Sequence, residues 1–246
     1  MRKYWRYVVT VMSVLVVWQI VSTLVGELVL PGPMHTIRKL ASEAQTGQYW
    51  WHLGTSLYRI LAALVVSFVT AVPLGLYLGM TPGADRYAKP LIYLSYPIPK
   101  IVLLPLVLLI FGLGDAGKIA MLAMILFFQL LISTRDAARG VGREAHYSLL
   151  SLGGKRRHLF MHVIWPAGLP AVFTALRIAT GTVVAVLFFV ESISTRHGMG
   201  FYILDAWGRA DIGRIFVGMV SLAGMGVVLY EIFDIMERVF CKWSRV

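Results

Sequence analysis

Long apolar segments constrain this chain more than any other feature of its sequence. A bilayer core of about 30 Å is crossed by roughly 20 apolar residues in a helix. Only 14% of the 246 residues are charged, whereas a soluble domain carries about 25%. The sequence therefore predicts an all-α polytopic membrane protein, a single transmembrane domain over residues 1–246, with about six transmembrane helices. The expected spans are residues 7–29, 54–80, 88–111, 118–134, 168–190 and 213–237.

The net charge of +11 is distributed unevenly among the connections. If six spans alternate in direction, most of the 23 Lys and Arg residues fall on one side, in the N-terminus, the turn at Arg86, the connection 135–166 and the C-terminus. Basic residues accumulate in cytoplasmic connections of membrane proteins. We therefore expect a multi-pass protein of the cell inner (plasma) membrane with both termini in the cytoplasm. The basic residues therefore set the orientation of the chain in the membrane, and nucleic acid is not an expected partner.

Two spans carry features that predict unusual packing. Gly75 and Gly79 form a GxxxG pair, which permits close contact with another helix. The third span contains four prolines, which exclude a regular helix; they are Pro90, Pro97, Pro99 and Pro105. Broken helices survive at membrane depth where protein or water satisfies the freed backbone groups. We therefore expect this span inside the helix bundle, near a pathway.

The connection 135–166 is much longer than the other predicted cytoplasmic turn. Leu149, Leu150 and Leu152 precede Gly153-Gly154, and Lys155, Arg156 and Arg157 follow. This pattern predicts two short helices joined by a glycine turn. Apolar side chains that face the cytosol favour a protein partner. A helix lying on anionic lipid explains the same residues, and composition does not separate the two interpretations.

The order of residues in this connection resembles a motif of ABC importer permeases. In that family a Glu-Ala-Ala triplet precedes a glycine, and nine residues later a segment ending in Leu-Pro follows. Here Gly153 precedes Val163-Ile164-Trp165-Pro166 at the same spacing, but Tyr147-Ser148-Leu149 occupy the triplet. The chain is similar to the nitrate/sulfonate/taurine branch over nearly its full length; the matching segments are Leu30–Pro33, Ser56–Phe68, Pro97–Ile119, Ala175–Ser192 and Gly198–Trp207.

The resemblance implies the transmembrane domain of a type I importer, a permease that forms the translocation pathway for a small solute. It further implies a homodimer, two cytoplasmic ATP-binding subunits and an extracytoplasmic solute-binding protein as partners, within membrane lipid. The solute would be an organic or inorganic oxyanion such as a sulfonate or nitrate. ATP and Mg would be used by the partner subunits, so this chain would be no enzyme and would bind no cofactor. The implied coupling helix comprises Tyr147, Ser148, Leu149, Leu150, Ser151, Leu152, Gly153 and Gly154.

Individual residues are candidates for the pathway or its gate. Lys100 lies in the proline-broken span and either attracts an anionic solute or binds freed carbonyl groups. Glu191 lies near the predicted outer end of the fifth span, and Met199 lies between Gly198 and Gly200; both are gate candidates. Arg177 is expected to bind backbone carbonyls near the cytoplasmic side.

Other functions are less consistent with the residues. An ion-gradient-driven secondary transporter predicts paired acidic residues at mid-membrane and an internal helix repeat; the sequence shows no such repeat, and its spans contain few acidic residues. The stretch Gly112–Lys118 matches nucleotide-binding patterns, but Ile119 replaces the required Ser or Thr and the flanks are apolar spans. We expect a tight turn there, with Asp115 and Lys118 in water. His158 and His162 are four residues apart without an evident third ligand, so no metal site is expected.

Overall fold

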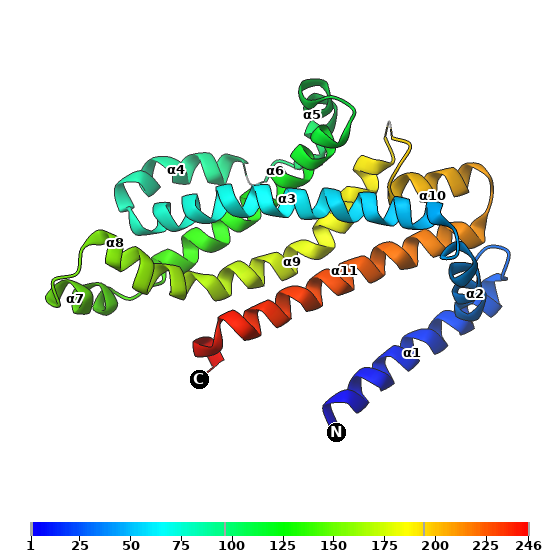
Figure 1. Ribbon diagram of the computed structural model, residues 1–246, viewed down its shortest axis with the longest axis horizontal. Helices are drawn as coiled ribbons and strands as arrows, with labels where there is room; N and C mark the ends of the chain where they lie inside the picture. Colours follow the sequence, from blue (N-terminus) through cyan, green and yellow to red (C-terminus); the bar gives the residue numbers. More distant parts are fainter. Residues whose placement is uncertain (1, 96, 194, 246) are drawn as a thin grey trace. The chain divides into compact units, whose positions relative to one another are not determined.

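The computed structural model describes residues 2–95, 97–193 and 195–245, and within them every regular element is helical (Figure 1). The side chains of a few helical residues, Leu150 among them, lie outside the described part. The helices are α1 Arg2–Val25, α2 Pro33–Glu43, α3 Gly47–Met80, α4 Pro82–Ser95, the 3₁₀ turn η1 Lys100–Leu103, α5 Leu104–Phe111, α6 Asp115–Arg139, α7 Arg143–Ser151, α8 Arg156–Leu159, the π turn η2 Phe160–Ile164, α9 Trp165–Glu191, α10 Met199–Gly208, α11 Ile212–Phe240 and the 3₁₀ turn η3 Lys242–Arg245.

The apolar segments form the expected spans. Five helices of the described residues are long and apolar enough to cross a membrane, namely α1, α3, α6, α9 with its preceding turns, and α11. A sixth span is obtained if α4 and the η1–α5 segment count as one bent crossing, and these two parts meet at 82°. The all-helical class and the broken third span are therefore confirmed.

Glycine and proline account for the places where helices end or deform. The first span ends at Val25 rather than at residue 29, because Gly26 adopts a φ of 97° that a helix cannot continue. After α8, the chain passes through the π turn Phe160–Ile164 directly into α9. Pro166 cannot donate to the backbone of the preceding turn, and a single π turn accommodates the irregularity within the helix. The second predicted short helix therefore continues into the fifth span.

The chain forms two compact units, which we describe separately. The first unit contains the chain through Ser56 together with Glu191–Ala223, and the second contains Leu57–Val190 and the chain from Gly224 onward. The chain passes between the units within α3, at the last residue of α9 and within α11.

In the second unit, the GxxxG pair makes the close helix contact that was predicted. A Cβ atom on Gly75 would lie 2.7 Å from the carbonyl oxygen of Leu131, and one on Gly79 would meet the Arg135 carbonyl oxygen. The backbones of α3 and α6 therefore touch along this face. Beside this contact, the Ser67 hydroxyl donates to the Ala123 carbonyl of α6 at 2.9 Å.

In the first unit, a cluster of charged and aromatic side chains joins α2, α10 and α11. The Arg214 guanidinium lies 4.4 Å from the centre of the Tyr202 ring and 3.6 Å from carboxylate oxygens of Glu43 and Asp205. The Tyr202 hydroxyl donates to Glu43 at 3.0 Å, and burial raises the pKa of this hydroxyl. The amphipathic helix α2 is thus fixed to its unit through polar contacts.

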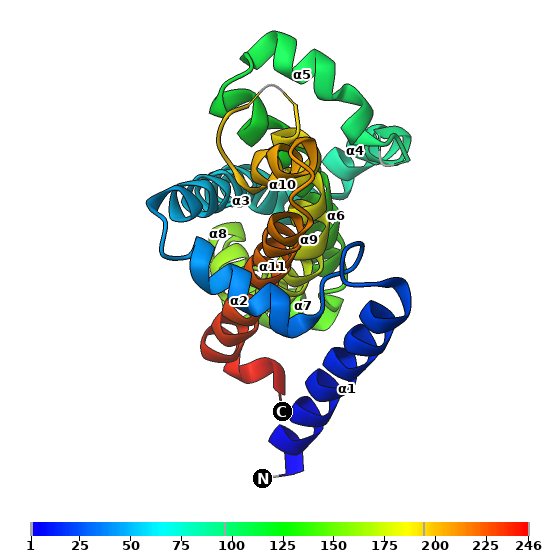
Figure 2. The same cartoon turned by 90° about the vertical axis from the view of Figure 1, so that its right-hand side faces the viewer.

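Helix α1 has little packing of its own within that unit. Only 6% of its membrane-spanning window is buried, and Figure 2 shows it extending away from α2. Its C-terminal half is anchored by Trp18, whose indole N–H donates to the Pro31 carbonyl at 3.1 Å, and by Ser22, whose hydroxyl donates to the Leu30 carbonyl at 2.7 Å. The remaining apolar side chains need lipid or another protein helix.

Candidate functional site

The glycine turn in the long connection caps α7. Gly153 has a φ of 79°, and the Gly154 N–H donates to the Leu149 carbonyl at 3.0 Å. This is the 6→1 hydrogen bond of a Schellman motif, in which the left-handed residue is normally glycine. A Cβ atom on Gly154 would lie 2.6 Å from the Leu149 side chain. Each glycine therefore has its own reason to be there: Gly153 for its backbone angle and Gly154 for its close contact.

The second helix begins directly after this turn. The Lys155 N–H donates to the Nδ1 atom of His158 at 3.2 Å, so the side chain at the third helical position satisfies the N-terminal backbone, as in a capping box. Figure 1 shows α7 and α8 together between the ends of α6 and α9. In the described ranges, no group of three His, Cys, Asp or Glu side chains is placed to hold a metal ion.

The predicted coupling residues differ in exposure. Leu152 is 86% exposed and Tyr147 is 64% exposed, so two large apolar side chains of α7 and its turn face away from the rest of the unit. The hydroxyls of Ser148 and Ser151 donate to carbonyls one turn earlier in α7. The side chain of Leu150 falls outside the described residues. The loop thus presents apolar surface beside a capped turn, and its role as a docking element stays a prediction.

An ion-pair cluster that sequence reasoning did not anticipate fixes the end of α6 from which this loop departs. Asp85 of α4 accepts hydrogen bonds from Arg135, through Nε and Nη2, and from Arg139 at 3.0 Å. Asp85 and Arg135 are both buried. Since buried charges are stable only when paired, this cluster ties α4 to α6. An acidic residue in the turn between two apolar spans was visible in the sequence, but its partners could not be identified because they lie about 50 positions away.

Lys100 binds the backbone of the broken span. Its Nζ donates to the Ser95 carbonyl at 2.9 Å and to the Ile98 carbonyl at 3.4 Å, and it lies 4.6 Å from the centre of the Phe128 ring. These contacts match the interpretation that the lysine satisfies carbonyls freed by the prolines. A role in attracting solute stays a prediction.

Two predictions about charged residues of the second unit were wrong. Arg177 binds carboxylates of α11 rather than carbonyls, with Asp234 at 2.6 Å and Glu237 at 2.7 Å. Lys118 is only 2% exposed instead of lying in water, and its Nζ donates to the Leu113 carbonyl at 2.6 Å. The turn at Gly112 and Gly114 leaves carbonyls that an α-helix would have satisfied, and the lysine takes them. Asp115 is half-exposed and pairs with the buried Arg59.

In the first unit, Glu191 and Met199 belong to one hydrogen-bonded cluster. Glu191 is fully buried and its carboxylate accepts the Ser56 hydroxyl at 2.7 Å and the Gly200 N–H at 2.9 Å. Met199 is also fully buried, and its N–H donates to the Ser56 hydroxyl oxygen at 2.7 Å. We call this cluster the Glu191 network; its members are His52, Ser56, Glu191, Gly198, Met199 and Gly200.

His52 and Ser56 were not singled out from the sequence. The Gly198 N–H donates to the Nδ1 atom of His52 at 3.1 Å, and His52 is 2% exposed. Both side chains lie on one face of α3, because they are four residues apart. This spacing is the sequence feature that could have identified them. A polar pair on one face of an apolar helix marks a point that needs a polar partner.

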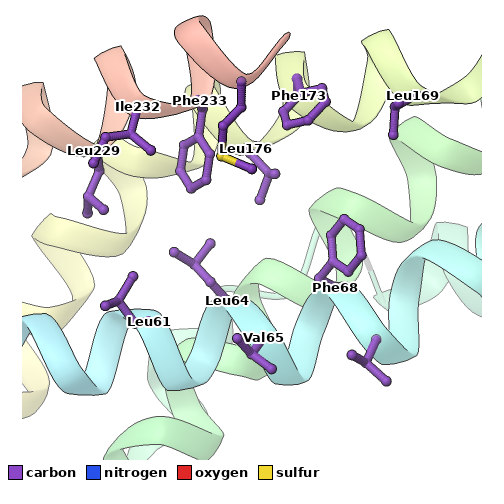
Figure 3. Close-up of a pocket in the computed structure, with 12 residues that line it drawn as sticks. Leu61, Leu64, Val65, Phe68, Leu169, Phe173, Leu176, Leu229, Ile232 and Phe233 are labelled. Atoms are coloured by element: carbon purple, nitrogen blue, oxygen red, sulfur yellow. The ribbon is translucent and has the colours of Figure 1, made fainter. Parts of the chain in front are cut away.

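A pocket of about 390 Å³ lies among α3, α9 and α11 of the second unit (Figure 3). Its twelve lining residues are hydrocarbon or thioether side chains, with Phe68, Phe173 and Phe233 among them. A polar solute would lose its hydration there without gaining a hydrogen bond. The pocket therefore does not belong to a route for an oxyanion.

Comparison with known proteins identifies the family. The family described as "binding-protein-dependent transport system inner membrane component" matches residues 71–246. The chain belongs to this family. The permease is therefore a multi-pass inner membrane component of an ABC importer, and the alternative of an ion-gradient-driven transporter is not favoured.

The permease is similar to several named relatives. It is 31% identical over 226 residues to the taurine transport system permease protein of Escherichia coli. The alignment covers 89% of this chain and 80% of the relative. It is 25% identical to a putative aliphatic sulfonates transport permease protein of Bacillus subtilis, over 94% of this chain and 85% of the relative. These matches confirm the nitrate/sulfonate/taurine branch.

Two further comparisons extend this picture. The formylaminopyrimidine transport permease protein of Halalkalibacterium halodurans is 24% identical, over 95% of this chain and 94% of the relative. Among solved structures, a chain of the inward facing MetNI methionine ABC transporter superposes with a TM-score of 0.64 and 18% identity, covering 78% of the permease and 96% of that chain. The permease thus has the type I importer fold.

Proposed function

We propose that the permease carries a small sulfonate, or a related oxyanion, across the inner membrane as the pathway-forming subunit of its importer. Support comes from the relatives, two of which are named for taurine and for aliphatic sulfonates. The relative named for formylaminopyrimidine is 24% identical, compared with 31% for the taurine relative. In the permease itself, the pathway runs past polar groups rather than through the apolar pocket of α3, α9 and α11.

ATP hydrolysis in two partner subunits drives transport, and the α7–α8 turn (Leu152–Lys155) is where the permease seats on them. The observation that carries this proposal is the pairing of a capped turn with exposed apolar side chains, Leu152 at 86% and Tyr147 at 64% exposure. Large apolar groups exposed together outside the membrane spans favour a protein contact. The Asp85 cluster at the end of α6 gives this contact a rigid base from which movement reaches α3 and α4.

Two copies of the permease surround the pathway, with both termini in the cytoplasm and the Glu191 network on the outer side. The connection that contains the α7–α8 turn and both termini are predicted to lie on the same side of the membrane. Basic residues are in excess on that side, which supports this orientation. Met199 then closes the outer end of the pathway, next to the site where the solute-binding protein delivers its ligand. Lipid covers the remaining apolar faces of the spans.

Substrate class is tested on the complete importer. The permease is purified with its ATP-binding subunits, reconstituted into liposomes, and supplied with its solute-binding protein and labelled taurine. We expect uptake that requires ATP and the binding protein and that unlabelled alkane sulfonates inhibit. Uptake of formylaminopyrimidine, with no inhibition by sulfonates, would refute the sulfonate proposal while leaving the permease assignment intact.

A further inference from the structure

The first turn of α10 is fixed by side chains from two other helices. The N–H groups of Gly198, Met199 and Gly200 open this helix, where backbone donors have no intrahelical acceptor. They donate to His52, Ser56 and Glu191, at 3.1, 2.7 and 2.9 Å respectively. Each acceptor is at most 2% exposed. A buried carboxylate is also favoured here by the positive end of the helix dipole.

Ser56 is the residue on which this arrangement depends. A serine hydroxyl has one donor and two acceptor positions. Here it donates to the Glu191 carboxylate, with Oε1 at 2.9 Å and Oε2 at 2.7 Å, and it accepts the Met199 N–H. Removing the hydroxyl leaves both the buried carboxylate and a buried N–H without this partner. Nearby Thr55 differs, because its hydroxyl donates only within α3, to the Trp51 carbonyl at 2.8 Å.

Gly198 is matched to the carboxylate that it faces. Its φ is 113°, which favours glycine, and a Cβ atom at this position would collide with the carboxylate of Glu191. The loop backbone therefore approaches Glu191 as closely as sterics allow. Access of water to the carboxylate is closed on this side, which makes the hydrogen bonds of the network stronger than they would be at a surface.

Ser56 and Glu191 also occupy special places in the chain. Ser56 is the last residue of the first unit before α3 continues into the second unit, and Glu191 is the first residue after α9 leaves it. Both residues of this hydrogen bond therefore lie directly at points where the chain passes from one unit to the other. The hydrogen bond between these two side chains joins α3 and α9 at the position where both adjoin α10.

We propose that Ser56 and Glu191 are positioning residues for Met199: their hydrogen bond holds the first turn of α10, and its release exposes the Met199 side chain. This inference rests on the proposed function for the gate role of Met199, but the positioning itself does not depend on the solute or on ATP. Ser56 on α3 and Glu191 on α9 thus determine whether Met199 on α10 is buried or exposed.

Thiol labelling tests this inference directly. Cys241 is the single cysteine of the chain, so Cys241→Ser gives a cysteine-free background for the reporter Met199→Cys. The variant is placed in lipid nanodiscs, where both faces are accessible, and its labelling rate with a polar maleimide is measured. We expect slow labelling in this parent and at least about a tenfold faster rate after Ser56→Ala, since the lost hydrogen bonds involve a charged acceptor.

Matched controls separate positioning from general loosening. Thr55→Ala removes a hydroxyl one residue away and should leave the Met199→Cys rate unchanged. A second reporter, Leu222→Cys, lies in the same unit and is 6% exposed in the wild type; its rate should not respond to Ser56→Ala. Equal rates with and without Ser56→Ala, or equal acceleration at both reporters, would overturn the proposal.

A second variant and the independence of labelling from transport make the result decisive. If Ser56→Ala does not yield folded protein, Gly198→Ala perturbs the same network from the α10 side and is expected to accelerate labelling of Met199→Cys in the same way. Labelling needs neither solute nor ATPase. Failure of sulfonate uptake therefore bears on the proposed function alone, whereas unchanged labelling bears on the positioning role alone.

Discussion

Gly153 is the residue of the α7–α8 turn whose backbone only glycine adopts without strain. Its φ of 79° places it in the left-handed region, where another L-residue costs about 1–2 kcal/mol. The cost is concentrated in the cap of α7, because the Gly154–Leu149 hydrogen bond depends on this geometry. In the proposed contact with the ATP-binding subunit, a shift of this cap would displace the exposed turn without disturbing the bundle.

Gly153→Val is therefore expected to reduce ATP-driven uptake about tenfold while the thermal unfolding midpoint of the permease stays within a few degrees of wild type. Gly142→Val is the control, because Gly142 has no positive φ and its Cβ would meet nothing within 4 Å. Uptake and unfolding are measured on the same preparations. If both variants transport at the wild-type rate, the α7–α8 turn has no special backbone requirement.

Asp211 gives the first unit a pH-dependent contribution to stability. Burial opposes ionisation of this carboxyl, but the Arg214 N–H at 2.9 Å and the Lys39 ammonium at 3.3 Å outweigh burial and lower its pKa. A carboxyl whose pKa is lower in the folded state stabilises that state above its unfolded pKa of about 3.9. The contribution is lost as the pH falls through the folded pKa.

The variant Asp211→Asn keeps an acceptor oxygen for the Arg214 N–H but loses the charge. At pH 7 we expect wild type to unfold at a higher temperature than this variant, and the gap to close as the pH is lowered below about 4. Thermal unfolding in detergent at several pH values measures both. A gap that is the same at pH 7 and pH 3 would show that the Asp211 charge contributes nothing.

At the scale of elements, the close contact between α3 and α6 depends directly on two glycines of α3, Gly75 and Gly79. Backbone carbonyls of Leu131 and Arg135 lie where Cβ atoms on Gly75 and Gly79 would stand. A backbone atom cannot move aside as a side-chain end can. Adding a methyl group here is an overpacking change, which costs about 1–3 kcal/mol.

Gly75→Ala is accordingly expected to lower the unfolding midpoint and the yield of folded permease, whereas Gly54→Ala on the same helix is not. A Cβ atom on Gly54 would meet nothing within 4 Å. The comparison is made by fluorescence-detected size-exclusion chromatography after heating. Equal retention of the folded peak in the two variants would contradict the close contact of α3 with α6.

The same elements show what the sequence could and could not predict. Spans, the broken third crossing and the GxxxG contact follow from local patterns, so they were predictable. The Ser56–Glu191 hydrogen bond joins residues 135 positions apart, and no local pattern pairs them. Lys118 was placed in water because a lysine in a glycine turn is usually exposed; the carbonyls that accept its ammonium appear only once the turn is built.

At the scale of the whole molecule, we propose that coupling to ATP hydrolysis depends on apolar surface outside the spans. Leu152→Glu adds a charge to a side chain that is 86% exposed, so the permease itself should fold normally. We expect uptake to fall about tenfold or more and co-purification of the ATP-binding subunits to weaken, because a buried unpaired carboxylate disfavours the interface.

The matched control adds the same charge elsewhere. Gln45 is exposed in the connection between α2 and α3, on the predicted outer side, and Gln45→Glu should leave subunit assembly unchanged. Uptake and the ratio of ATP-binding subunit to permease are measured for both variants. Wild-type values for Leu152→Glu would remove the α7–α8 turn from the contact with the ATPase.

As a whole molecule, the chain forms the pathway of an ATP-driven, binding-protein-dependent importer. The most direct measurement is uptake of labelled taurine into proteoliposomes that contain the permease and its ATP-binding subunits, with binding protein outside and ATP inside. We expect uptake only when binding protein and hydrolysable ATP are both present, with no response to an imposed sodium or proton gradient. Uptake driven by such a gradient in the absence of ATP would contradict the assignment as an ATP-driven importer.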